Sequence, residues 1–254
     1  MSNKRALVCG ASQGIGKAIA VALAQKGHTV TLFSRSPEKL QKIVEELPGE
    51  GHDFFAGDIG QPDSWQAQLE QKQQDRPYDI LICNSGGPAS GKISQASAED
   101  FLGAMGNHLV ANALLSQIVL PTMRKNKWGR IISVTSTSVK VPIPHLGVSN
   151  TARAAVATWA KTLSLEVAAD GVTVNNVMPG FTKTPRLEKL MEAKAKNTGQ
   201  TVEQVRQAWL KLVPMGRFCK PQETAALVEF MVSDAAGAIT GQNIAVDGGR
   251  LGCL

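Results

Sequence analysis

The chain has 254 residues, of which 43% are hydrophobic and 19% are charged, and its formal net charge is +6 at pH 7. These proportions exclude a disordered chain and allow a single large domain, 1–254. No apolar run reaches the roughly 18 residues that would span a bilayer, and the first residues lack a secretory cleavage pattern. We therefore expect a cytoplasmic protein that has no membrane partner.

Cysteine and charge placement narrow the class further. The four cysteines, at positions 9, 83, 219 and 253, lack metal-ligand spacing, so we expect buried reduced thiols and no metal. Residues 181–220 hold nine Lys or Arg and three Glu, which accounts for the whole net charge. This segment either attracts an anionic ligand or is a solvated helix face. It lacks the interleaved aromatics and motifs of a nucleic-acid binder, so we expect no such partner.

Short β-rich runs alternate with helical patterns along the chain. In order, the patterns predict strand 5–9, helix 14–26, strand 28–33, helix 37–47, strand 52–56, helix 62–75, strand 78–83, helix 97–125, strand 129–135, helix 148–169, strand 172–177, helix 221–233 and strand 243–246. Strands that are apolar on both faces and separated by helices are typical of a covered parallel sheet. We predict an α/β fold, a doubly wound Rossmann-type sheet of about seven parallel strands with helices on both faces.

The segment 186–213 interrupts this alternation. A helix of its own starts at Thr201, where Gln204 stands three residues on, as in a capping box. An apolar stripe is predicted at Val202, Val205, Trp209 and Leu212. Two interpretations stay open, a mobile flap over a substrate pocket and an ordinary packed helix pair.

The stretch "VCGASQGIGKAIA" places Gly10, Gly14 and Gly16 between the first predicted strand and the first helix. Glycine lets the backbone turn tightly and approach a pyrophosphate, whose charge then meets the helix N-terminus. The placement at strand, turn and helix makes this three-glycine pattern specific. It predicts that the chain binds a dinucleotide.

Charge at the end of the second predicted strand favours one dinucleotide. Ser34 stands where a carboxylate would accept a ribose diol, and Arg35 follows it. A carboxylate would repel a 2′-phosphate, whereas a guanidinium pairs with it, so NADP(H) is predicted over NAD(H). The alternative is that Arg35 is an ordinary exposed turn residue.

The spacing Gly-x-x-x-Gly-x-Gly resembles that of the short-chain dehydrogenase/reductase family, and further stretches extend the resemblance in order along the whole chain. They are "GDI" (57–59), "CNSGG" (83–87), "VNNVMPGFTKT" (174–184) and "ITGQNIAVDGG" (239–249). The chain looks like the 3-oxoacyl-carrier-protein reductases of this family, and the resemblance implies a homo-oligomer, either a tetramer or a dimer, in which Trp159 could pack against a second copy. It implies cofactor contacts from Gly10, Ser12, Gln13, Gly14, Ile15, Gly16, Ser34, Arg35, Asp58, Ile59, Asn84, Ser85, Gly86, Arg153, Pro179, Gly180 and Thr184.

The family site departs from its pattern here. In the family a Tyr moves the proton, a Lys four residues later lowers the pKa of that Tyr, and a Ser and an Asn complete the site. By the resemblance Ser136 keeps the Ser, whereas Ser149 stands in the Tyr place, Arg153 in the Lys place and His108 in the Asn place. The one tyrosine, Tyr78, opens the fourth predicted strand and cannot substitute.

Each replacement has a chemical consequence. Ser149 can donate a hydrogen bond but is a poor acid, and Arg153 stays charged and can stabilise an oxyanion. An unperturbed imidazole titrates near neutral pH, so His108 is the best remaining acid and His145 the second choice. Our hypothesis is that hydride comes from NADPH, that Ser136, Ser149 and Arg153 hold the oxyanion, and that His108 supplies a proton. Conjugate reduction of an enone suits this set, with carbonyl reduction as the other option.

Two further classes stay open. The chain could be an inactive nucleotide-binding homologue that acts as a sensor or assembly partner, or an isomerase or epimerase that uses the cofactor transiently. All four altered or retained site positions can still form hydrogen bonds, which favours an enzyme. We expect a small-molecule or acyl-thioester substrate, and the basic segment 181–220 suggests that it carries an anionic group.

Overall fold

A computed structural model describes residues 3–253 of the protein, and within them one parallel sheet has seven strands. The strands are β1 (Arg5–Cys9), β2 (Thr29–Ser34), β3 (Asp53–Ala56), β4 (Ile80–Cys83), β5 (Gly129–Val134), β6 (Val172–Pro179) and β7 (Asn243–Val246). Their order across the sheet is β3-β2-β1-β4-β5-β6-β7, and every neighbouring pair is parallel. The predicted Rossmann-type fold is confirmed.

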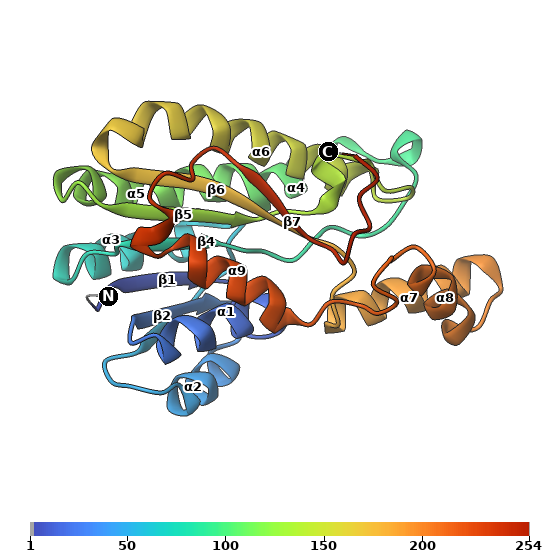
Figure 1. Cartoon of the computed structure of the whole chain (residues 1–254), viewed down its shortest axis with the longest axis horizontal. Coiled ribbons are helices and arrows are strands. Elements are labelled where there is room, and N and C mark those ends of the chain that lie inside the picture. The colour runs from blue at the N-terminus through green and yellow to red at the C-terminus, as the bar shows by residue number, and fades with distance from the viewer. Residues whose placement is uncertain (1–2, 254) are drawn as a thin grey trace.

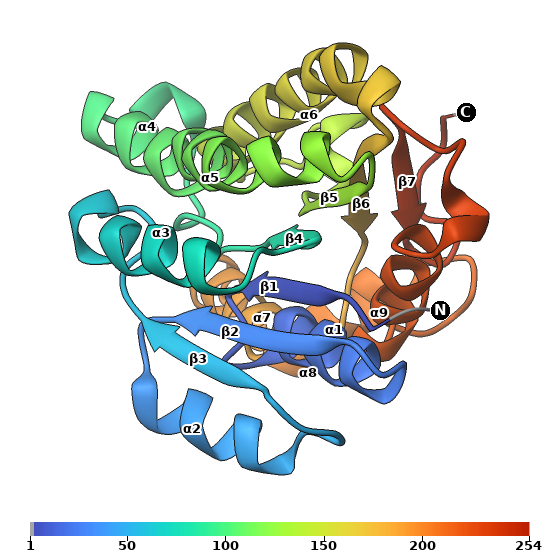
Figure 2. The same ribbon diagram turned by 90° about the vertical axis from the view of Figure 1, so that its left-hand side faces the viewer.

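Helices cover both faces of this sheet. They are α1 (Gly14–Gln25), α2 (Pro37–Glu46), α3 (Gln66–Asp75), α4 (Ala98–Met105), α5 (Ala111–Lys125), α6 (Gly147–Val167), α7 (Pro185–Thr198), α8 (Val202–Leu210) and α9 (Pro221–Met231). Helices α1 and α9 pack together on one face, and α3, α5 and α6 cover the other (Figure 1, Figure 2).

Alternation along the strands explains the two cores. In β1, Ala6 and Val8 belong to the hydrophobic cluster under α1 and α9, whereas Leu7 and Cys9 belong to the cluster under α3, α5 and α6. Successive side chains of a strand point to opposite faces, so an uninterrupted apolar run is needed to fill both clusters. This requirement is why the strand sequences predict the layers as well as the strands.

The chain order places a crevice at the middle of the sheet. From β1 the chain moves outward to β2 and β3, then returns to β4 on the other side of β1. The connections after β1 and β4 therefore leave the carboxyl edge in opposite directions. Ligands of open parallel sheets bind at such a switch point.

The predicted helix 97–125 is not one regular helix. A π-helical turn, Gly106–Val110, separates α4 from α5. Such turns are rare, are often found at functional sites, and carry no periodicity signal of their own. The turn matters because it contains His108.

The segment 186–213 forms a helix pair that extends beyond the carboxyl edge of the sheet (Figure 1). Helices α7 and α8 share a small hydrophobic cluster, in which Val205 is buried and the Trp209 ring stacks on Phe181 with centroids 4.8 Å apart. The capping box of Thr201 and Gln204 is confirmed. The predicted stripe was wrong at both ends, because Val202 and Leu212 are exposed and Leu212 lies past the end of α8.

The cysteine prediction holds for three of the four thiols. Cys9, Cys83 and Cys219 are buried and free, and burial raises the pKa of Cys83 to about 12, which makes its thiol inert. The expectation was wrong for Cys253, which is exposed in the C-terminal tail. Among residues 3–253, no cluster of three or more His, Cys, Asp or Glu side chains is suited to a metal ion, and no helix is long and apolar enough to cross a membrane.

Candidate active site

The turn between β1 and α1 has the shape of a phosphate-binding loop. Gly10 and Gly14 have φ angles of 60° and 58°, which favour glycine. A Cβ on Gly16 would lie 2.2 Å from the carbonyl oxygen of Gly10, so no other residue fits there unless the turn moves. The side chain of Gln13 does not cap α1, and the first turn of α1 has no acidic residue. The N–H groups of this turn are thus available to an anion such as a pyrophosphate.

Two other loops close against this turn. The Asn84 amide, just after β4, donates to the carbonyl oxygens of Cys9 and Gly10 at 3.3 Å each. Thr184 follows β6, and its Cγ2 would lie 3.2 Å from a Cβ on Gly14. Gly180, which follows Pro179 at the end of β6, donates its N–H to the Val246 carbonyl oxygen at 2.9 Å. The structure therefore brings together segments that lie up to about 170 residues apart in the sequence.

Other predicted cofactor residues are distributed around the same turns. Ser12 is partly buried in the loop, and Ile15 packs against the cluster of α1 and α9. Ser85 is partly buried, and Gly86 is exposed, with nothing within 4 Å of the Cβ that it lacks. The space beside Gly86 leaves room for a ligand to approach the backbone after β4.

A second group lies where β2 and β3 end. Ser34 closes β2, and the following Arg35 has a side chain 77% exposed, with Nη1 3.8 Å from Oδ2 of Asp58. Asp58 accepts the N–H of Gly60 at 3.1 Å, and Ile59 packs against the cluster of α3, α5 and α6. Such an exposed, long ion pair is weak, so Arg35 can turn toward a phosphate at little cost.

Arg153 is fixed at the end of β5. Its Nη1 donates to the carbonyl oxygens of Val134 and Thr135 at 2.9 and 2.8 Å, and its Nε lies 3.4 Å from the Ser149 hydroxyl oxygen. Burial, together with the positive charge of Arg186, lowers the pKa of Arg153 to about 10. The guanidinium therefore stays charged at neutral pH while its position is held by backbone carbonyls.

Ser149 contacts this guanidinium directly, and Ser136 follows Thr135, whose carbonyl oxygen binds it. Ser136 directly follows Thr135, and its hydroxyl accepts the N–H of Ser138 at 3.1 Å. Ser149 is 7% exposed, in the first turn of α6. In the described part of the chain each hydroxyl accepts a bond and donates none, which leaves its hydrogen for another acceptor.

His108 is almost fully buried in the π-helical turn, which packs against α6. Its Nδ1 is 2.6 Å from the Ser85 hydroxyl oxygen, and among residues 3–253 its buried Nε2 has no hydrogen-bond partner. Burial and the charges of Arg153 and Arg186 lower the pKa of His108 to about 3.

The expectation that His108 titrates near neutral pH was therefore wrong. Burial beside two guanidinium groups disfavours the imidazolium, and the sequence contained no sign of either effect. The neutral ring still has one N–H. If Ser85 donates to Nδ1, that N–H is on Nε2, the nitrogen that has no protein partner.

The other two residues considered for proton transfer are less well placed. His145 is exposed, with a φ angle of 63°, and its ring forms no hydrogen bond with another predicted site residue in the part of the chain that the structure describes. Tyr78 precedes β4, at the amino edge of the sheet, where burial raises the pKa of its phenol. Tyr78 therefore lies at the opposite edge of the sheet from Ser136, which follows β5.

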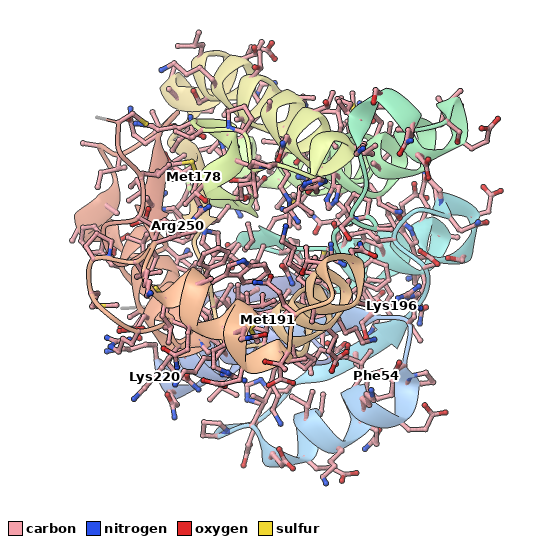
Figure 3. The ribbon with its side chains drawn as sticks, turned by 90° about the vertical axis from the view of Figure 1, so that its right-hand side faces the viewer. Phe54, Met178, Met191, Lys196, Lys220 and Arg250 are labelled. Carbon is pink, nitrogen blue, oxygen red and sulfur yellow. The ribbon has the colours of Figure 1, made fainter. Side chains whose placement is uncertain are left out.

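The sequence interpretation missed two site residues. Arg186, at the start of α7, donates from Nη2 to the Pro88 carbonyl oxygen, and the same Nη2 lies 3.2 Å from the position of a Cβ on Gly87. Arg250 donates from Nη1 to the Thr137 hydroxyl at 3.0 Å. Arg186 was visible only as one of nine basic residues, and nothing in the local sequence marked Arg250. Figure 3 looks onto this edge of the molecule, with Arg250 labelled.

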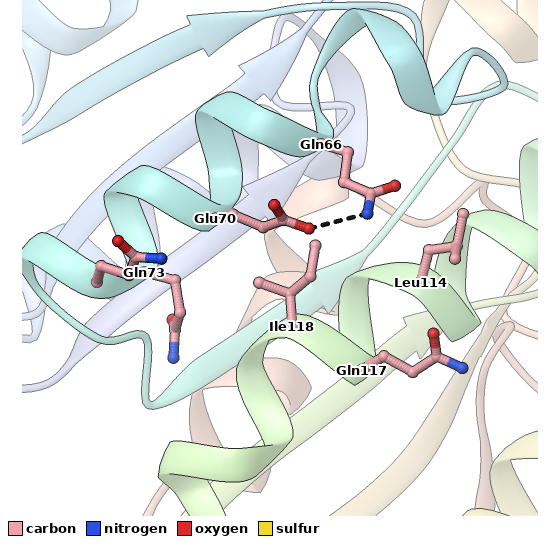
Figure 4. Close-up of a pocket in the computed structure, with 7 residues that line it drawn as sticks. Gln66, Glu70, Gln73, Leu114, Gln117 and Ile118 are labelled. Atoms are coloured by element: carbon pink, nitrogen blue, oxygen red, sulfur yellow. Dashed lines mark hydrogen bonds between the residues drawn. The ribbon is translucent and has the colours of Figure 1, made fainter.

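A separate surface pocket lies between α3 and α5 (Figure 4). Its lining is formed by Gln66, Glu70, Gln73, Gln74, Leu114, Gln117 and Ile118. Gln66 donates to Glu70 at 2.8 Å, and Gln73 is bonded to the Tyr78 N–H and the Thr122 hydroxyl. None of the predicted site residues lies there, so we assign this pocket no part in the chemistry.

The parallel sheet, the switch point and the glycine turn define a dinucleotide-binding α/β protein. Residues 10–250 match the family described as enoyl-(acyl carrier protein) reductase. The chain belongs to this family of short-chain dehydrogenases/reductases.

Individual relatives are similar over nearly their whole length. A putative ketoacyl reductase of the granaticin polyketide synthase from Streptomyces violaceoruber is 36% identical, covering 96% of this chain and 92% of the relative. The NADPH-dependent reductase BacG of Bacillus subtilis is 31% identical, covering 99% of each. The crystal structure of YwfH, an NADPH-dependent reductase involved in bacilysin biosynthesis, superimposes with a TM-score of 0.94 at 30% identity, covering 100% of both chains.

Proposed function

We propose that this protein is an NADPH-dependent reductase that adds hydride to a conjugated enone or a carbonyl of a small or acyl-thioester substrate. Family membership supports the oxidoreductase class, and the names of BacG and YwfH support NADP(H) as the cofactor. One observation carries the proposal. The packing of α6 against the π-helical turn groups the Arg153 charge with the hydrogen-bonding side chains of Ser149 and His108.

The residues present fit the cofactor. The glycine turn of Gly10, Gly14 and Gly16 accepts the pyrophosphate at the N-terminus of α1, and Arg35 pairs with the 2′-phosphate. The remaining contacts come from Asn84 to Gly86, from Pro179 to Thr184 and from Arg153. When bound, the reduced nicotinamide supplies the hydride.

The protein's own groups stabilise the negative charge that develops on the substrate oxygen. Arg153 holds a fixed positive charge beside the site, and the Ser136 and Ser149 hydroxyls donate hydrogen bonds to that oxygen. Donors that are already oriented, in a site shielded from water, need no rearrangement during the reaction. Together they replace the phenol donor of the family pattern with several weaker donors and one cation.

His108 acts as a neutral relay in this proposal. Its Nε2 gives up a proton to the substrate while Nδ1 takes one from the Ser85 hydroxyl, so the ring ends neutral in its other tautomer. Ser85 is partly exposed and recovers its proton from water. A relay of this kind is slower than direct protonation by an imidazolium. Enone reduction tolerates the delay, since the enolate that it forms needs stabilisation more than immediate protonation.

The competing proposal is an inactive nucleotide-binding homologue that acts as a sensor or assembly partner. A screen of enones and β-ketoacyl thioesters, followed by NADPH absorbance, separates the two. We expect enone-dependent NADPH oxidation that falls at least about tenfold in Ser149→Ala and is unchanged in Thr158→Ala, an exposed position on α6. Tight NADPH binding without oxidation by any substrate would favour the inactive homologue. Interconversion of isomers without net oxidation would favour an isomerase or epimerase.

We also propose that residues 186–213 are a substrate flap within a single domain, 1–254, and that the protein is a homo-oligomer, a dimer or tetramer. The helix pair has its own small hydrophobic cluster, which supports movement as a unit. On α6, Trp159 is partly buried against the main core, and Leu165 is 72% exposed, which leaves Leu165 for a contact with a second copy. Limited proteolysis with and without NADP⁺ and a solution mass measurement test the two proposals separately.

A further inference from the structure

Three guanidinium groups at the carboxyl edge of the sheet have no acidic partner. Within residues 3–253, Arg153, Arg186 and Arg250 have no carboxylate oxygen inside the 4.0 Å limit of an ion pair. Arg217, in contrast, binds Glu223 at 2.6 Å. Cations that are partly buried are usually paired, so this group requires a counter-charge from elsewhere.

Arg250 is the one of these three arginines with a buried guanidinium nitrogen that has no acceptor in the described part of the chain. Its one hydrogen bond runs from Nη1 to Thr137, its Nε is buried without an acceptor in the described part of the chain, and its guanidinium carbon lies 4.4 Å from the centre of the Phe181 ring. Asp247 is near but accepts the N–H groups of Gly249 and Leu251 at 3.0 and 2.8 Å. The edge of the guanidinium formed by Nε and Nη2 therefore has no protein acceptor.

The neighbours of Arg250 belong to the substrate side of the site. Thr137 directly follows Ser136, and Phe181 directly follows Gly180 at the end of β6. The ring of Phe181 also stacks on Trp209 of the helix pair, so the guanidinium lies between the end of β5 and the proposed flap.

The lysines of the basic segment do not offer the same opportunity. Five of its six lysines are exposed, namely Lys183, Lys189, Lys196, Lys211 and Lys220, and Lys194 is partly buried. In Figure 3, Lys196 and Arg250 lie on opposite sides of the view. Solvated lysines bind anions weakly, whereas a guanidinium stacked on an aromatic ring is held in one plane and matches a planar two-oxygen anion.

We propose that the substrate of this reductase carries a carboxylate and that Arg250 binds it in bidentate fashion, with Arg186 adding a second positive charge. This inference rests on the proposed function and specifies its substrate class. It favours an enone acid or an oxo acid over a carrier-bound thioester. Because Nε is buried, binding in this mode requires residues 247–251 to move so that the Nε and Nη2 edge meets the carboxylate.

A binding experiment tests the inference without turnover. We expect 4-oxopentanoate, titrated calorimetrically into the protein saturated with NADP⁺, to bind at least about tenfold more tightly than its methyl ester. Arg250→Gln should remove this preference, and Arg250→Lys should keep part of it because the charge remains while the planar edge is lost. Lys196→Gln is the matched control for net charge and should behave as wild type.

Steady-state kinetics with pairs of acids and esters provide a second test of the inference. The pairs are acetoacetate with methyl acetoacetate and 4-oxopent-2-enoate with its methyl ester. In Arg250→Gln we expect KM for the acids to rise about 10- to 100-fold, with little change for the esters and none in NADPH affinity. An equal effect on acid and ester, or efficient use of a thioester independently of Arg250, would overturn the inference. Binding of 4-oxopentanoate that depends on Arg250, without any NADPH oxidation, would retain the carboxylate site and reject the proposed reductase.

Discussion

The proposed nucleotide end and the proposed substrate end of the site differ in composition. At the carboxyl ends of β1 and β4, glycines and backbone N–H groups shape the cradle, and the one side-chain amide involved, Asn84, binds backbone carbonyls. At the ends of β5 and β6, the site consists of side chains that extend into it from α6, the π-helical turn, α7 and the C-terminal tail.

The difference gives a physical reason for the proposed departure from the family pattern at one end only. A Cβ on Gly10 or Gly16 would lie 2.6 or 2.2 Å from a neighbouring atom, so steric overlap allows only glycine at these two positions of the cradle. A cluster of side chains can exchange a phenol for a hydroxyl or an ammonium for a guanidinium and still direct hydrogen bonds to the same region. The following predictions test this contrast, from the largest expected effect to the smallest.

Gly16→Ala should disable the nucleotide end. Its Cβ would meet the Gly10 carbonyl oxygen at 2.2 Å, which forces the turn open and moves the N–H groups away from the pyrophosphate. We expect NADPH affinity, measured by fluorescence titration, to fall on the order of 100-fold. Gly103→Ala is the matched control, because nothing lies within 4 Å of its Cβ. Unchanged NADPH affinity in Gly16→Ala would show that backbone shape does not set cofactor binding.

Arg35→Gln should weaken the preference for NADPH over NADH without a general loss of nucleotide binding. Loss of a charge-assisted bond to the 2′-phosphate should weaken NADPH binding by about 10- to 30-fold and leave NADH affinity nearly unchanged. Lys42→Gln, on the exposed side of α2, removes the same charge without the contact and should have little effect. Equal weakening of both nucleotides would point to a general electrostatic role for Arg35.

His108→Asn should change both the turnover rate and the stability of the fold at acid pH. We expect turnover to fall about tenfold through loss of the relay. The pKa of His108 is lowered from 6.5 to about 3, so between these values the unfolded chain binds a proton that the folded protein does not. The contribution of neutral His108 to the free energy of unfolding should therefore be fully present above pH 6.5 and be lost as the pH falls. At pH 5 the wild type should have lost about 2 kcal/mol relative to the variant.

Denaturant unfolding of both proteins at pH 7.5 and pH 5 measures this difference. His28, whose pKa burial also lowers, is present in both proteins and cancels in the comparison. Identical acid sensitivity of wild type and variant would mean that the imidazole of His108 is not held neutral by the fold. Near-wild-type turnover would reject the relay but leave the electrostatic part of the proposal intact.

The sequence predicted the elements of the nucleotide end because its signals are local. Three glycines within seven residues, an apolar strand before them and a helix after them specify a turn whatever the rest of the chain does. The apolar strands likewise predict two covered faces, because both clusters draw on alternate residues of the same strands. The predicted stripe on α8 failed at Val202 and Leu212, where helix length and packing decide exposure.

The charge state and the partners of the substrate end were decided by tertiary structure. His108 is neutral because burial and two arginines surround it, one of them 45 residues away and the other 78. Arg250 meets Thr137 across 113 residues, and Arg186 meets Pro88 across 98. Sequence alone specifies backbone shape through short-range sterics. Electrostatics within the site depends on which distant side chains share the same desolvated space, and only the folded chain determines that.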